Sequence, residues 1–137
     1  MRTDATSEAA EPAPPAIATL AGCTLARVAV DDSLTLSLRA AGRSVTLRID
    51  AAGRVRAGGR VLPFDTDADP ASAAPLLGLL NARVSGASVR PDGGLLLTFG
   101  TGEVLDVEPS EHAIAWSAIA ADGAQASCIA EGRVVWE

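Results

Sequence analysis

The chain contains no lysine and no tyrosine, and only four of its 137 residues are aromatic, so its core must be built from aliphatic side chains. No apolar run approaches the ~20 residues of a membrane-spanning helix, and the N-terminus lacks the apolar segment of a signal peptide. Cys23 and Cys128, the only cysteines, lack Cys-x-x-Cys spacing, which argues against a disulfide-stabilised secreted domain. We therefore expect a cytoplasmic protein with reduced thiols; a disulfide becomes possible only if the sheet brings the two cysteines together.

Charge is distributed unevenly along the chain. The net charge is −6, but residues 22–60 carry +4 and residues 61–137 carry −8. Because phosphate backbones and anionic lipids repel an acidic protein, we expect neither nucleic acid nor a membrane as partner. The unevenness indicates either two differently charged solvated faces or an acidic half that meets a basic protein.

The N-terminal segment differs in composition from the rest of the chain. Residues 1–16 are rich in proline, alanine, glutamate and serine and show no hydrophobic periodicity. Such a segment cannot bury enough apolar surface to offset the entropy lost on ordering. We predict a disordered tail over residues 1–21 and one β-rich domain over residues 22–137. That domain is long enough to fold without disulfide bonds or a structural metal ion.

Alternation of apolar and polar residues predicts antiparallel strands. Residues 33–39 and 44–50 place leucine, valine and isoleucine on one face and mainly serine, threonine and arginine on the other. Turn residues delimit further strands. These are expected over residues 23–30, a hairpin over 54–62, and 83–90, 95–99, 103–108, 113–120, 125–129 and 133–136. One short helix is expected over residues 73–80, capped by Ser72 and holding Pro75 in its first turn.

The two halves of the chain look alike. Leu25-Ala-Arg-Val-Ala-Val and the two strands after it match Val84-Ser-Gly-Ala-Ser-Val and the two strands that follow. Convergent hairpin patterning is the alternative explanation. A lone three-stranded sheet would expose its apolar face, so two of them must cover each other. We predict a mostly β fold, a two-layer antiparallel sandwich or flattened barrel made from two similar three-stranded meanders with one short helix as crossover.

Several short motifs complete a recognisable layout. They are the Gly22-Cys23 start, the turn Pro91-Asp92-Gly93-Gly94-Leu95, the segment Glu111-His112-Ala113-Ile114-Ala115-Trp116, and Cys128 followed by a glycine turn and Val134-Val135-Trp136. With the paired meanders they resemble a family of small, uncharacterised actinobacterial proteins that carry a domain of unknown function. Ile114-Ala115 and Glu131-Gly132 depart from the Tyr-Glu and Gly-Gly expected there. The resemblance implies a β-rich fold and a bacterial cytoplasm, and it implies no activity.

No motif predicts a cofactor or a metal. Asp65–Asp69 begins like a calcium loop, but Pro70 stands where glycine is required and Leu76 where glutamate is required. His112 and two distant cysteines do not make up a zinc site. To act as a general base, His112 beside Glu111 would need a nucleophile or a substrate pocket nearby, and no motif in the sequence indicates one. An enzyme is therefore the less favoured hypothesis.

Three arginines flank a glycine turn. Arg54, Arg56 and Arg60 surround Gly58-Gly59 and would suit an anion. No aromatic residues are interleaved with them, and the spacing of a phosphate-binding loop is missing. We interpret the segment as a solvated hairpin.

Binding is the function that the sequence favours. The leading hypothesis is a non-enzymatic protein-binding module of the immunity or accessory type, whose acidic half masks a basic partner. The alternatives are a self-assembling structural subunit that pairs sheet edges, and a small ligand-binding protein or enzyme with a site inside the sandwich, for which His112 is the residue to test. Trp116 and Trp136 are expected as core anchors; an exposed one would mark an interface. The candidate interface residues are Glu103, Asp106, Glu108, Trp116 and Trp136.

Overall fold

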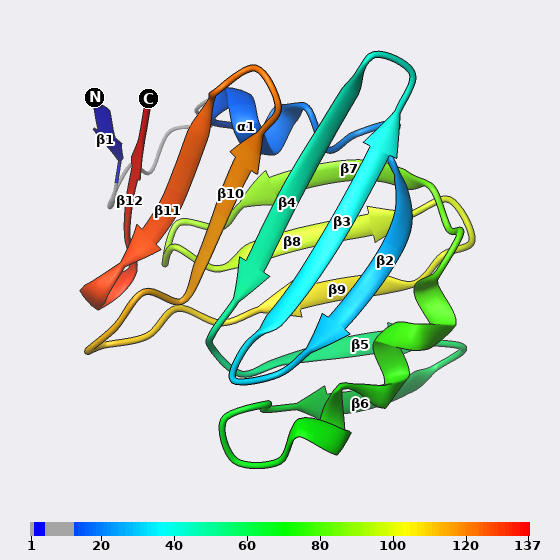
Figure 1. The fold of residues 1–137 in the computed structure, drawn as a ribbon. Helices are drawn as coiled ribbons and strands as arrows, with labels where there is room; N and C mark the ends of the chain where they lie inside the picture. The colour runs from blue at the N-terminus through cyan, green and yellow to red at the C-terminus, as the bar shows by residue number, and fades with distance from the viewer. Residues whose placement is uncertain (1, 5–12) are drawn as a thin grey trace.

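Two antiparallel sheets pack face to face in the computed structural model, which describes residues 2–4 and 13–137 (Figure 1). The seven-stranded sheet has the order β1-β12-β11-β10-β4-β3-β2, and the five-stranded sheet has the order β6-β5-β9-β8-β7. Each sheet keeps two edge strands, so the prediction of a mostly β sandwich is confirmed and neither sheet closes into a barrel. The strand bounds are β1 Arg2–Asp4, β2 Thr24–Val30, β3 Leu34–Ala40, β4 Arg43–Ile49, β5 Gly53–Ala57, β6 Arg60–Phe64, β7 Val84–Val89, β8 Leu95–Phe99, β9 Val104–Val107, β10 Trp116–Ala120, β11 Gln125–Ile129 and β12 Arg133–Trp136.

The alternating pattern of the sequence produces the layers directly. In β3 the three leucines are fully buried while Thr35 and Ser37 are only half-buried, and in β4 Val45, Leu47 and Ile49 are buried while Thr46 and Arg48 are exposed. The inward faces of both sheets supply a mainly aliphatic core, in which Trp116 is one of the largest fully buried side chains. The pattern therefore predicted the face of each of these strands correctly.

The two halves of the fold repeat each other. The meander β2-β3-β4 lies in one sheet and the meander β7-β8-β9 in the other, and each has a register shift at the same place, after Leu25 and after Val84. Each meander is followed by a hairpin that crosses to the opposite sheet: β5-β6 pairs with β9, and β10-β11 pairs with β4. This exchange of hairpins ties the two layers together and fits the predicted internal duplication.

The N-terminal boundary of the domain differs from the prediction. Residues 15–18 form a short helix, α1 (Pro15–Ala18), which contacts β7, β10 and β11. Ile17 and Leu20 are fully buried in the core, and Pro15 begins the helix, where its missing N–H costs nothing. The predicted disordered tail is therefore wrong for residues 13–21, because these few apolar side chains cover the open end of the sandwich. β1 pairs with β12 at the far edge, and residues 5–12 lie outside the described part.

The predicted crossover helix exists in a different form. It is a 3₁₀ helix, η1 (Pro70–Leu79), between β6 and β7, and it contacts β2 and β6. Asp69 caps it by accepting a hydrogen bond from the Ala71 amide at 3.1 Å. Ser72, the predicted cap, instead donates to the Asp69 carbonyl and accepts from the Asp65 amide, so it fixes the preceding loop. That loop uses the carboxylates of Asp65 and Asp69 as turn and cap acceptors.

The two cysteines are free and buried. Cys23 precedes β2 and Cys128 lies in β11, and three strands separate β2 from β11 within the sheet. At ~4.8 Å per strand step this places them far beyond the reach of a disulfide. In the described part of the chain, no helix has the length and apolar character that crossing a membrane requires.

Candidate functional site

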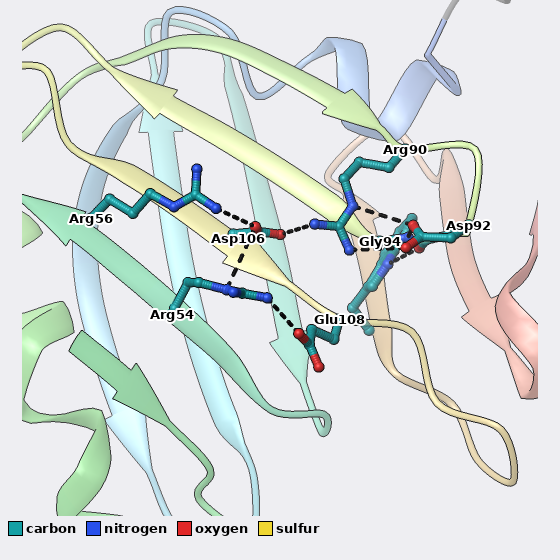
Figure 2. A network of polar contacts seen from close by, with 9 residues as sticks. Arg54, Arg56, Arg90, Asp92, Gly94, Asp106 and Glu108 are labelled. Atoms are coloured by element: carbon teal, nitrogen blue, oxygen red, sulfur yellow. Dashed lines mark hydrogen bonds and ion pairs between the residues drawn. The ribbon is translucent and has the colours of Figure 1, made fainter. Parts of the chain in front are cut away.

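The outer face of the five-stranded sheet carries a network of six charged side chains (Figure 2). Asp106 of β9 lies at its centre and is buried, although its strand position points away from the core. Arg90 donates from Nη1 to Asp106 Oδ1 at 2.5 Å, and Arg54 and Arg56 approach Asp106 Oδ2 at 3.7 and 3.6 Å. The three guanidinium groups thus cover the carboxylate from both sides and exclude water from it.

Sheet register explains why these charges meet. Arg54 of β5 stands directly opposite Asp106, and Arg56 lies two residues further along β5 on the same face. Arg90 follows β7, and it reaches Asp106 across β8, the strand that lies between β7 and β9. Arg54 also donates to Glu108 at 2.5 Å, so three cations and three anions compensate one another across the network.

Arg90 links this network to a loop at the end of the sandwich. Its Nε and Nη2 donate to the two carboxylate oxygens of Asp92 at 3.2 and 3.1 Å, while Nη1 holds Asp106. Asp92 in turn accepts from the Gly94 amide at 2.9 Å. Burial raises the pKa of Asp92, but the Gly94 amide and Arg90 outweigh it and hold that pKa below its ordinary value. Asp92 is therefore a fixed anion in the turn before β8.

Two glycine turns interlock beside Asp92. Gly93 and Gly132 both have positive φ, 92° and 74°, and a Cβ on either one would collide with the backbone of the other's turn. Trp116 is fully buried beneath them and donates from Nε1 to the Gly93 carbonyl at 2.9 Å. Glu131 adopts a left-handed conformation and its amide donates to Ser110. Segments from three parts of the chain are thus locked together, with glycine required at the contact.

A surface pocket of about 530 Å³ opens at this junction. It is lined by Asp92, Pro109, Ser110, Glu111, His112, Glu131 and Gly132. Three of these residues are carboxylates, and Glu111 and His112 project into solvent with side chains 87% and 90% exposed, 3.6 Å apart. Within the described residues, no cluster of three or more potential ligands is arranged to hold a metal ion. The arrangement offers an exposed acidic rim on a rigid base.

The five candidate interface residues do not form one surface. Asp106 and Trp116 are buried, so neither can meet a partner, and Trp116 is the core anchor that the sequence predicted. Trp136 is partly buried against the core. Glu108 pairs with Arg54, and Glu103 accepts a hydrogen bond from Thr101 in the β8–β9 turn. Sequence reasoning missed the burial of Asp106 because its arginine partners come from two other strands.

The hairpin that carries Arg54, Arg56 and Arg60 differs from the solvated hairpin that the sequence predicted. The β5–β6 turn is formed by Gly58 and Gly59, both with positive φ. Arg54 and Arg56 are bound to Asp106 and are therefore not simply solvated. Arg60, the first residue of β6, is exposed and lies outside this network.

The fold defines this chain as a two-layer antiparallel β-sandwich with an acidic loop pocket at one end. A family model matches residues 16–137, so the chain belongs to DUF6188, a family of unknown function. That match begins within α1, in agreement with the packing of this helix into the domain. No curated protein matches the chain. No solved structure matches it either.

Proposed function

We propose that this protein is a non-enzymatic protein-binding module and that its binding site is the acidic loop pocket around Glu111 and Glu131. The observation that carries the proposal is a rigid base beneath an exposed acidic rim: interlocked Gly93 and Gly132, fixed by Trp116, hold the loops that line the pocket. Loops on a rigid scaffold are common carriers of binding residues.

The chemistry of the rim favours a basic partner. Arg90 already neutralises Asp92, which leaves Glu111 and Glu131 facing the pocket with His112 as the only lining residue able to carry positive charge. Ile114, in the same connection, is 48% exposed and adds an apolar contact beside the acidic rim. An arginine or lysine side chain of a partner protein fits this combination, and acidic complementarity accelerates association with a basic surface.

The other two hypotheses gain less support from the geometry. The side chain of His112 contacts Glu111 and is 90% exposed, so it lacks the burial that orients a general base. Self-assembly through sheet edges is disfavoured at two of the edge strands. Edge strand β6 carries Pro63, which has no N–H to donate to a neighbouring strand. The start of edge strand β2 is already hydrogen-bonded to the backbone of residues 81–84.

The test is capture of partners from a lysate of the source organism, with identification by mass spectrometry. One dominant basic protein should bind the wild-type chain and be lost in the double variant Glu111→Lys/Glu131→Lys. The variant Asp67→Lys, which makes the same type of charge reversal at an exposed loop position outside the pocket, should retain it. Capture that is equal in all three proteins, or no captured partner, would refute the proposal.

A further inference from the structure

A second cluster of charged side chains lies apart from the loop pocket, around Gly22. Gly22 has a φ of +90°, and the position that a Cβ would occupy there is 2.8 Å from Arg43 Nη2 and 3.7 Å from Arg83 Nη2. The two guanidinium nitrogens are therefore at most 6.5 Å apart, the sum of those distances. Because Gly22 has no Cβ, Arg43 Nη2 can lie against it, and the surface between the two guanidinium groups forms a small cradle.

The neighbouring strand adds a third arginine. Thr24 pairs directly with Arg39 of β3 on one side and with Arg83 on the other. Directly opposite residues of antiparallel strands point to the same face, with Cβ atoms about 4.5–5.5 Å apart. Arg83, Thr24 and Arg39 thus form one row on the outer face, whereas Arg43 pairs with Ala40 of the inner face and reaches Gly22 around the end of the sandwich.

The three arginines share no counter-ion. Arg39, Arg43 and Arg83 are exposed, and within residues 2–4 and 13–137 none of them takes part in an ion pair. Arg43 donates instead to the Ala21 carbonyl at 3.1 Å, which fixes its guanidinium beside Gly22. This differs from the Asp106 network, where three arginines surround a carboxylate of the chain itself. Arg43 and Arg83 repel one another at this separation, and an anion between their guanidinium groups would remove that repulsion.

We propose that Arg43 and Arg83 form a binding site for the phosphate group of a small molecule, seated between their guanidinium groups beside Gly22. Guanidinium groups bind phosphate oxygens through parallel N–H donors at about 2.7–2.9 Å. A tetrahedral dianion accepts such donors from several directions at once, whereas a planar carboxylate is satisfied by one bidentate partner. The cradle lies near the start of β4, whereas the end of β4 adjoins the loop pocket through Asp50 and Ala115, so this site is independent of the proposed protein-binding site.

The test is a titration with inorganic phosphate and with pyrophosphate, followed by ¹⁵N–¹H NMR at constant ionic strength. The Gly22 and Thr24 amides and the arginine Nε–H groups of this cluster should shift and saturate, with a dissociation constant on the order of 1 mM or tighter for pyrophosphate. Arg83→Gln and Arg43→Gln should each weaken binding by about tenfold or more, since each removes charge-assisted hydrogen bonds. Arg60→Gln removes a comparable exposed arginine in β6, at the opposite edge of the five-stranded sheet from β7, and should leave the affinity unchanged.

The spectra themselves show whether each variant is folded, and Arg83→Gln does not depend on the contact that Arg43 makes with Ala21. Shifts that grow linearly without saturating, or saturation with the same constant in both arginine variants, would overturn the site. Because the two sites share no residue, loss of partner capture in the Glu111→Lys/Glu131→Lys variant leaves this titration unaffected.

Discussion

Replacement of Asp106 by asparagine tests whether the charge network stabilises the fold. Asparagine keeps the size of the side chain but removes the charge that three guanidinium groups surround. The hydrogen bond from Arg90 at 2.5 Å is charge-assisted and is worth about 1.5–3 kcal/mol. The approaches of Arg54 and Arg56 are longer and come from side chains 33% and 53% exposed, so each adds only about 0.2–1 kcal/mol.

We therefore expect Asp106→Asn to lower the free energy of unfolding by about 2–5 kcal/mol. Urea denaturation followed by tryptophan fluorescence measures this change, because Trp116 is buried in the native state and becomes exposed on unfolding. The matched control is Glu108→Gln, which removes a carboxylate that is 47% exposed and should cost less than about 1 kcal/mol.

The dependence on salt concentration distinguishes the stability costs of the two substitutions further. The cost of Glu108→Gln should disappear in 1 M sodium chloride, where the Debye length is about 3 Å, whereas most of the cost of Asp106→Asn should remain because the carboxylate is buried. Equal costs for the two substitutions at low salt would refute the view that Asp106 is the stabilising centre of the network.

Three further predictions concern the loop junction and its surroundings. Gly132→Ala should cost more than about 3 kcal/mol in urea denaturation, because a Cβ would strike the facing turn in addition to the strain at φ 74°; Gly123→Ala, at φ 95° in open space, should cost only about 1–2 kcal/mol. Trp116→Phe should cost about 2 kcal/mol or more, because the Gly93 carbonyl loses its donor in a buried site. Burial, with a contribution from a nearby carboxylate, raises the pKa of Cys128 from 9.0 to about 11, so its thiol should resist alkylation at pH 8 until the protein unfolds. Between pH 9 and 11 the native state then holds a proton that the unfolded state has lost, so stability should fall as pH rises through this window, and less steeply in Cys128→Ala.

The strands could be predicted from the sequence because their signal is local. Residues 95–99, 125–129 and 133–136 form strands with the predicted bounds, and the buried face of β4 is the one that alternation indicates. The burial of α1, by contrast, could not be predicted from local periodicity. Its buried residues, Ala16 and Ile17, and Leu20 just after it are too few to form a periodic pattern, and they are buried only because the end of the sandwich lies beneath them.

The candidate site could not be predicted in the same way, because it is made by contacts between strands and loops far apart in the chain. A period of two assigns Asp106 to the solvent face, and that assignment is correct for the direction of its side chain. Its burial arises from Arg54 and Arg90, which the sheet order brings to either side.

The same sheet order joins the network to the loop pocket. Removing Asp106 frees one of the three donors through which Arg90 is held, and Arg90 is the residue that fixes Asp92 beside the interlocked glycine turns. If the pocket binds a partner, Asp106→Asn should therefore weaken binding although its side chain lies outside the pocket, and Arg56→Gln, which leaves the Arg90 contacts intact, should not. Partner affinity measured by calorimetry under conditions where both variants are fully folded distinguishes these outcomes, and equal affinities would show that the pocket keeps its shape without the network.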